Sequence, residues 1–321
     1  MSNLALDPDF ARVLALLPAP PPQPTTALSL RAQITAGFNP ILTSYTVPPS
    51  VTETIIHIPI PASPGTTIAL HRLTPTTPTS SSPTAAVVYA HGGGMIAGAA
   101  AHARPALVPL VLATSATFYS VEYRLAPEHP FPTPVEDVYT ALEWVRDHAA
   151  DQNIDPARIA LVGDSAGGGL AAGAALMTRD RHFAPPVAKL VLIYPMLDDR
   201  TSIAADHPLA AQPMIWTDAS NKLAWAAYLG DEDRTRGHVS PYAAPARAGS
   251  FAGLPRTYID CGGLDLFRDE NLAFAAGLAA ANVEVEVHLY PGVGHGFDFL
   301  APGTPVARAA AENRLWALKR L

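Results

Sequence analysis

A serine at the centre of a glycine-rich pentapeptide is the side chain of this sequence best placed for covalent chemistry. The pentapeptide, Gly163-Asp164-Ser165-Ala166-Gly167, fits the pattern G-x-S-x-G. The apolar run at 159–162 predicts a buried strand, and residues 167–177, rich in Gly, Ala and Leu, predict a tightly packed helix. Small neighbours permit a sharp strand-to-helix turn, which exposes the Ser165 hydroxyl at a helix N-terminus, where the dipole favours developing negative charge. We therefore predict that Ser165 is an activated nucleophile.

A second glycine run fits another requirement of the same chemistry, the stabilisation of developing negative charge. Acyl transfer passes through a tetrahedral oxyanion that backbone N–H groups must meet, and loss of one such donor typically costs about 10²–10³ in rate. His91-Gly92-Gly93-Gly94 follows a predicted strand at 86–90, and glycines can turn their amides into a cavity without side-chain obstruction. We assign Gly93, Gly94 and Ala166 as oxyanion donors and expect His91 to anchor the loop rather than to catalyse.

A nucleophilic serine also needs a base and a group that orients the base. Residues 283–290 alternate apolar and polar as a strand does, and His295 follows between two glycines on a loop that can reach across a site. The acid is expected on the loop after the preceding predicted strand, and we choose Asp265. Asp260 and Asp269 remain alternatives, since either can serve instead as a strand-end or helix-capping carboxylate.

Together these motifs resemble those of the hormone-sensitive lipase-like family of α/β-hydrolases, in the microbial esterase branch with GDSAGG around the nucleophile. The order Ser165, Asp265, His295 is the one expected of α/β-hydrolases. The resemblance implies a serine esterase acting on modest acyl esters without cofactor or metal. The sequence departs from the pattern at Met95, where relatives usually place an aromatic residue, and at Leu266, where proline is usual. The matching segments are 91–94, 123–128, 154–156, 163–168, 265–270 and 295–297.

The rhythm of predicted strands and helices indicates an α/β fold with a mostly parallel central sheet flanked by helices. One domain is ordinary for 321 residues of which 49% are hydrophobic. The resemblance implies the α/β-hydrolase fold with a helical cap over the serine. We expect the cap to comprise about 1–47 and about 198–240, and the catalytic core about 48–197 and 241–321.

The cap segments contain predicted helices near 28–38 and over 217–229. Substrate choice is expected to depend on the cap. The residues that we expect to line the substrate pocket are Met95, Phe38, Met214, Ile215 and Trp216. Simple packing of the cap against the core is an equally good interpretation of these side chains.

Composition argues against several classes of partner. The formal net charge of −7, with no basic cluster in the sequence, argues against a nucleic-acid partner. Cys261 is the only cysteine, so no intramolecular disulfide is possible, and we expect a buried thiol. Asp198-Asp199 lacks the further ligands that a metal needs. The first twenty residues have neither a basic region nor a long apolar run, so we expect no signal peptide, no membrane anchor and a cytoplasmic location.

These observations predict a serine carboxylesterase for short- to medium-chain acyl esters. A lactonase or amidase would use the same groups and differ in pocket shape. An enolate-type lyase (dehydratase) and a non-catalytic small-molecule receptor are further alternatives, and the intact Gly-His-Gly-Phe context of His295 disfavours the receptor. The last predicted strand, 283–290, is a candidate sheet edge that invites pairing with a second copy, so a homodimer is our hypothesis.

Overall fold

In the computed structural model, which describes residues 4–18, 21–77, 82–235 and 238–321, eight strands form a single sheet. Their order across the sheet is β1-β2-β4-β3-β5-β6-β7-β8. The pairs β1–β2 and β2–β4 are antiparallel and the remaining pairs are parallel, so the sheet is mostly parallel, as predicted. The strands are β1 Val51–Pro59, β2 Thr67–Pro75, β3 Thr84–Ala90, β4 Thr117–Glu122, β5 Ile154–Asp164, β6 Lys189–Ile193, β7 Thr257–Gly262 and β8 Val285–Tyr290.

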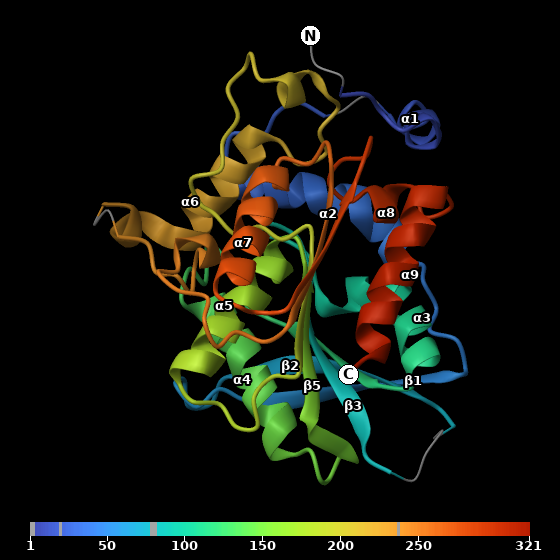
Figure 1. Cartoon of the computed structure of the whole chain (residues 1–321), viewed down its shortest axis with the longest axis vertical. Coiled ribbons are helices and arrows are strands. Elements are labelled where there is room, and N and C mark those ends of the chain that lie inside the picture. Colours follow the sequence, from blue (N-terminus) through green and yellow to red (C-terminus); the bar gives the residue numbers. More distant parts are fainter. Residues whose placement is uncertain (1–3, 19–20, 78–81, 236–237) are drawn as a thin grey trace.

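Helices cover both faces of this sheet (Figure 1). Helices α3 (Arg104–Thr114) and α9 (Pro305–Lys319) pack against each other on one face, while α4 (Thr133–Asp147), α5 (Ala166–Asp180) and α7 (Arg268–Ala280) cover the other. Central strands are therefore buried on both sides, and every residue of β6 and β7 is buried. This explains why β6 reads as a near-continuous apolar run rather than as an alternating one.

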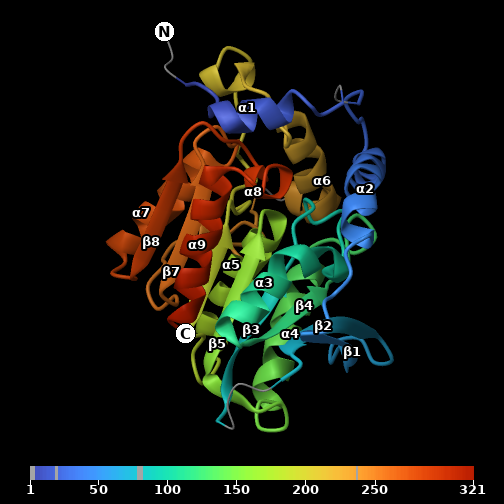
Figure 2. The same cartoon turned by 90° about the vertical axis from the view of Figure 1, so that its right-hand side faces the viewer.

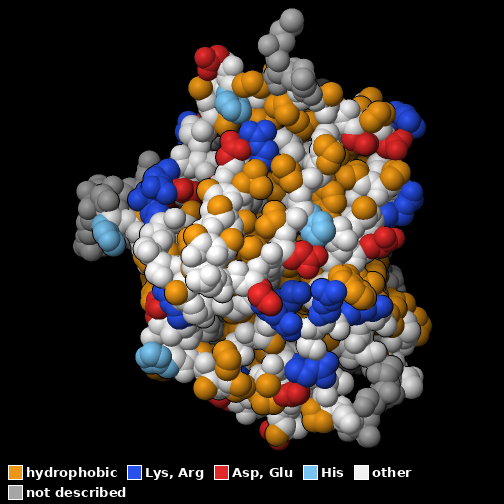
Figure 3. All heavy atoms as spheres, in the orientation of Figure 1, with side chains coloured by type: hydrophobic (Ala, Val, Ile, Leu, Met, Phe, Trp, Pro, Cys, Tyr) orange, Lys and Arg blue, Asp and Glu red, His pale blue; other side chains and the backbone are white. Residues whose placement is uncertain are grey.

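Three cations from separate segments hold the C-terminal end of α9. Lys189 Nζ donates to the carbonyl of Ala317 at 2.9 Å, and Arg256 Nη2 donates to that of Arg320 at 2.6 Å. Arg158 adds a bond of 3.3 Å to the carbonyl of Leu321. Lys and Arg side chains gather around this end of the chain (Figure 3). The last carbonyls of a helix have no partner within it, and positive charge also complements the helix dipole, so these contacts fix α9 in place.

The N-terminal helices and the segment after β6 lie together beyond one end of the sheet (Figure 2). Helix α1 (Pro8–Leu14) is capped by the carboxylate of Asp7, whose N–H donates to the carbonyl of Gly292 at 2.8 Å. Helix α2 (Ala27–Thr43) extends beyond the predicted end near residue 38. Helix α6 (Asp218–Thr235) contains a break at Gly230, where φ is 67°, so its regular part matches the prediction.

The chain's last strand also differs slightly from its prediction. Strand β8 begins two residues later than predicted, at Val285, and lies at the edge of the sheet. It is followed by the loop of His295 and by the short helix α8 (Phe297–Leu300). The carboxyl ends of β5, β7 and β8 therefore deliver the three loops that carry Ser165, Asp265 and His295 to one end of the sheet.

Candidate active site

Ser165 stands at the turn between β5 and α5 in a strained conformation. Its φ is 53° and its ψ is −120°, values that a non-glycine residue adopts only when its surroundings enforce them. A Cβ atom on Gly163 would lie 2.1 Å from the carbonyl oxygen of Gly167, and one on Gly167 would lie 2.0 Å from that of Ala90. The two glycines of the motif are thus required by the close approach of three backbone segments.

His295 bridges the serine and one of the three candidate carboxylates. Its Nε2 lies 2.9 Å from Ser165 Oγ, and its Nδ1 lies 2.8 Å from Asp265 Oδ2. Asp265 is completely buried, and its other oxygen accepts the N–H of Phe267 at 2.9 Å. A serine, a histidine and a carboxylate in this linear arrangement can transfer a proton from the hydroxyl to the imidazole.

The two alternative carboxylates have other partners. Asp260, on β7, forms a buried ion pair with Arg314, whereas the exposed Asp269 pairs with its neighbour Arg268. Neither carboxylate is hydrogen bonded to His295, which leaves Asp265 as the one of the three that meets the imidazole.

The imidazole of His295 lies in a negatively charged environment. Burial by itself lowers the pKa of this group, but the charge of Asp265, its hydrogen bond, and the charges of Asp164 and Asp298 outweigh burial. The pKa of His295 is therefore raised above the ordinary value of 6.5. Rings from two elements hold the imidazole edge-on, with Tyr194 at 4.8 Å and Phe267 at 5.2 Å between ring centroids. Sequence reasoning assigned no role to either aromatic residue.

Asp164, within the serine motif, holds the glycine loop against β5. Its Oδ1 accepts the N–H of Gly92 at 3.0 Å and a hydrogen bond from the Tyr89 hydroxyl. Burial raises the pKa of Asp164 and, more strongly, that of Tyr89. A Cβ on Gly92 would lie 2.4 Å from Asp164 Oδ2, so only glycine permits this contact. The serine turn and the glycine loop are thereby joined directly.

The proposed oxyanion donors lie around this junction. Gly93 and Gly94 have φ values of 126° and 64°, and Ala166 is the first residue of α5. His91 is buried, its ring is stacked on Tyr123 at 4.2 Å, and its Nδ1 lies 2.8 Å from the carbonyl of Gly92. Burial lowers the pKa of His91 to about 4, so it stays neutral near neutral pH. This is the structural setting of a loop anchor.

The segment before α6 reaches the glycine loop. A Cβ on Gly94 would lie 2.5 Å from Trp216 Cη2, so this indole packs directly on the loop. Nearby, the carbonyl of Pro213 lies 4.0 Å from a Cβ position on Gly294, beside His295. Met214 is half-buried and Ile215 is exposed. The segment therefore spans from the histidine loop to the glycine loop.

Two further pocket candidates differ in what the structure says of them. Met95 is fully buried at a φ of 59°, and its Cε lies 3.3 Å from a Cβ position on Gly169 in α5. The side chain of Phe38 lies outside the described residues. Both assignments to a substrate pocket stay predictions.

The segment after β4 braces the core near the site. Arg124 donates two hydrogen bonds to the buried Asp137 on α4, and Glu128 receives two from Arg31 on α2. The hydrogen bonds from Arg31 lower the pKa of Glu128 to about 2. The sequence alone does not identify Asp137 or Arg31 as partners, because both lie on other elements.

Two absences concern the described part of the chain alone. Within 4–18, 21–77, 82–235 and 238–321, no group of three or more His, Cys, Asp or Glu side chains is arranged to hold a metal ion. Among the same residues, no helix combines the length and apolar character needed to cross a bilayer.

Comparison with known proteins adds to this geometry. The carboxylesterase NlhH of Mycobacterium tuberculosis is 36% identical over 235 residues, which cover 73% of this chain and 73% of that protein. An ethyl acetate hydrolase of Pseudomonas putida is 32% identical over 232 residues, covering 70% of this chain and 69% of that protein. A bacterial heroin esterase has a TM-score of 0.89 and 35% identity, with 98% of each chain covered.

The family-level match covers the serine, aspartate and histidine loops together. Residues 87–299 match the family with the α/β hydrolase fold. This match, the sequence identity to the relatives and the fold shared with the heroin esterase establish the family. The chain belongs to the α/β hydrolases, in their hormone-sensitive lipase-like branch.

Proposed function

We propose that this carboxylic ester hydrolase cleaves short- to medium-chain acyl esters through an acyl-enzyme on Ser165. His295 takes the hydroxyl proton as Ser165 Oγ attacks the ester carbonyl, and Asp265 holds the imidazole in the required tautomer. The alcohol leaves with the proton from His295. Water then attacks the acyl-enzyme with His295 again as base, which frees the acid.

One observation carries this proposal, namely the hydrogen bonds of His295 to Ser165 Oγ at 2.9 Å and to Asp265 Oδ2 at 2.8 Å. The N–H groups of Gly93, Gly94 and Ala166 are proposed to receive the oxyanion. In its support, the N–H groups of Gly93 and Gly94 make no backbone hydrogen bond within the described residues. Donors fixed in advance require little reorganisation when the negative charge develops.

We further propose that the N-terminal helices and the segment at about 198–240 form a cap that sets the size of the acyl pocket. Trp216 supports this, because its indole packs on Gly94 at the oxyanion loop. The hydrogen bond from Asp7 to Gly292 also supports it, because Gly292 belongs to the histidine loop. The related ethyl acetate hydrolase is named for a two-carbon acyl ester, which favours a small acyl group here as well.

A series of p-nitrophenyl esters from acetate to palmitate tests the activity and the pocket. We expect turnover that peaks at short or medium acyl chains, together with an acyl adduct on Ser165 that rapid quenching and mass spectrometry detect. A folded protein that turns over none of these esters would contradict the proposal. Faster turnover of lactones or amides in direct competition would assign the activity to those substrates, and water elimination without an adduct would indicate a lyase.

The pH dependence of kcat/KM tests the role of His295. A general base must be neutral in the free enzyme, so activity is retained above its pKa and lost as the pH falls through it. Because neighbouring carboxylates raise the pKa of His295, we expect the acidic limb of the profile above pH 6.5. Initial rates between pH 4.5 and 9 check this. A rate that stays constant down to pH 4.5 would exclude a histidine base.

We also propose that two copies pair along β8. This strand lies at the edge of the sheet, and its Val287 and Leu289 are 40% and 43% exposed. An unpaired edge offers N–H and carbonyl groups to a second identical edge, and the exposed apolar side chains would be covered in the pair. Light scattering at micromolar concentration should give twice the monomer mass, and Val287→Lys should restore the monomer. A monomer mass for the unmodified protein would overturn this proposal.

A further inference from the structure

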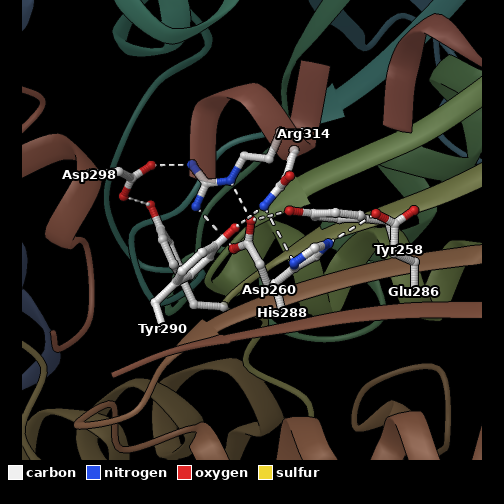
Figure 4. Close-up of polar contacts among 9 residues, drawn as sticks. Tyr258, Asp260, Glu286, His288, Tyr290, Asp298 and Arg314 are labelled. Carbon is white, nitrogen blue, oxygen red and sulfur yellow. Dashed lines mark hydrogen bonds and ion pairs between the residues drawn. The ribbon is translucent and has the colours of Figure 1, made fainter. Parts of the chain in front are cut away.

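A buried charged cluster that the proposed reaction does not use joins α9, β7 and α8 (Figure 4). Its centre is Arg314 on α9, which is 7% exposed. The guanidinium donates two hydrogen bonds to Asp260, from Nε to Oδ2 at 2.6 Å and from Nη2 to Oδ1 at 2.9 Å. Its remaining nitrogen, Nη1, pairs with Asp298 Oδ2. One guanidinium thus pairs with two carboxylates, and the three groups together carry a net negative charge.

This cluster reaches the imidazole through Tyr194. The Tyr194 hydroxyl donates to Asp298 Oδ1 at 3.0 Å, and its ring lies edge-on to His295 with an interplanar angle of 63°. Its N–H donates to the carbonyl of Asp260 at 2.7 Å. Tyr194 has a φ of 34°, which is unusual for a bulky side chain and persists only where contacts enforce it. Contacts to Asp260 and Asp298 provide that enforcement at both ends of the residue.

Asp298 also belongs to the loop that carries the base. It lies in α8, three residues after His295, so whatever holds Asp298 also holds this loop. Arg314 can hold it firmly, because α9 is itself fixed at its C-terminal end by Lys189, Arg256 and Arg158. Phe267 closes the arrangement, with its ring edge-on to the imidazole at an interplanar angle of 86°.

We propose that Asp298 and Tyr194, held by Arg314, are positioning residues that fix His295 between Ser165 and Asp265 and favour its protonated form. This inference rests on the proposed function, in which His295 alternates between neutral and protonated states. The negative charge of Asp298 stabilises the positive charge that His295 acquires as Ser165 attacks.

The charged and titratable groups around the imidazole come from several elements. Asp265 follows β7, Asp164 ends β5, Asp298 lies in α8 and Tyr194 follows β6, while Arg314 stands behind Asp298. Asp298 is the carboxylate of this set that is bonded neither to His295 nor to the glycine loop, since Asp265 meets the imidazole and Asp164 accepts the N–H of Gly92. Its pKa is lowered, because the charge of Arg314 and the hydrogen bonds from Arg314 and Tyr194 outweigh the opposing effect of burial, so it is ionised at neutral pH.

The test is the variant Asp298→Asn, studied by NMR of ¹³C-labelled histidine and by the pH profile of ester hydrolysis. Loss of this charge should lower the pKa of His295 by about 1 unit, the lower end of the shift that one opposite charge produces. The acidic limb of kcat/KM should move to lower pH by the same amount, and kcat should fall while KM stays unchanged. A purely structural role would reduce activity at every pH without moving the limb.

A second variant and a matched control complete the design. Tyr194→Phe keeps the ring and removes the hydroxyl, so it should shift the pKa of His295 less than Asp298→Asn and add nothing in the double variant. The control is Asp180→Asn, because Asp180 also pairs with an arginine, Arg179, and accepts from a tyrosine, Tyr242, but lies at the far end of α5 from Ser165. It should leave both the pKa and the limb unchanged.

The outcomes separate this inference from the proposed function. An unchanged pKa of His295 in both Asp298→Asn and Tyr194→Phe would overturn the positioning role, whether or not the protein hydrolyses esters. Absence of ester hydrolysis in the unmodified protein would overturn the function instead, while the NMR titration, which needs no turnover, still decides the effect of Asp298 on His295. If Asp298→Asn does not fold, Tyr194→Phe decides by the same measurement.

Discussion

Replacement of Ser165 by alanine is expected to lower kcat for a short-chain p-nitrophenyl ester by on the order of 10⁴–10⁶, the scale seen when a serine nucleophile is removed. The reason is that Ser165 Oγ is the hydrogen-bond partner of His295 Nε2, and within the described residues no other group takes that position. Steady-state rates for the purified variant, with mass spectrometry for the acyl adduct, check this. The remaining activity should reflect the oxyanion donors and substrate binding alone.

A matched control separates chemistry from folding. Ser120 is also buried, on β4, where its hydroxyl donates to the carbonyl of Ala100 at 3.1 Å. Ser120→Ala should therefore keep kcat within a few-fold while it costs about 1 kcal/mol of stability. In addition, combining Ser165→Ala with His295→Gln should add little further loss, because the two residues act as one unit. Retention of most activity by a folded Ser165→Ala variant would rule out the acyl-enzyme mechanism.

The second large effect is expected from Asp265→Asn, which should lower kcat by about 10⁴. The amide is nearly the same size as the carboxylate, so it preserves packing in this completely buried position. However, an amide N–H facing Nδ1 favours the tautomer that presents a proton, rather than a lone pair, to Ser165. Initial rates across the pH range, with a thermal unfolding curve for the same preparation, measure the loss and show whether the variant folds.

The alternative carboxylates supply the comparison. Asp269 lies four residues after Asp265, is exposed and pairs with Arg268. Asp269→Asn should therefore leave kcat unchanged. Asp260→Asn should instead destabilise the fold, because it leaves the buried Arg314 without its bidentate partner, and such changes often cost about 3–5 kcal/mol. A loss of activity in Asp269→Asn that equals that of Asp265→Asn would refute the assignment of Asp265.

The predictions that succeeded from the sequence were those with local causes. Alternation of apolar runs with glycine-rich turns predicted the strands around Ser165 and the histidine loop, since a sharp turn and a buried strand each impose a pattern within about ten residues. The end of α2 was placed too early, and the break at Gly230 was not foreseen. Ends of elements depend on what packs against them, and local pattern carries little of that information.

The sequence by itself determined the mostly parallel α/β fold, the glycines that two close backbone approaches require, and the order of serine, aspartate and histidine along the chain. The tertiary structure decided which of three carboxylates, all within ten residues, meets His295. It also decided that Trp216 packs on Gly94 and that Arg314 joins Asp260 to Asp298. The physical reason is the distance along the chain over which each interaction acts. Backbone sterics act between neighbours and leave a pattern in the sequence, whereas a charge or a ring is satisfied by any suitable partner that the fold brings within a few ångströms.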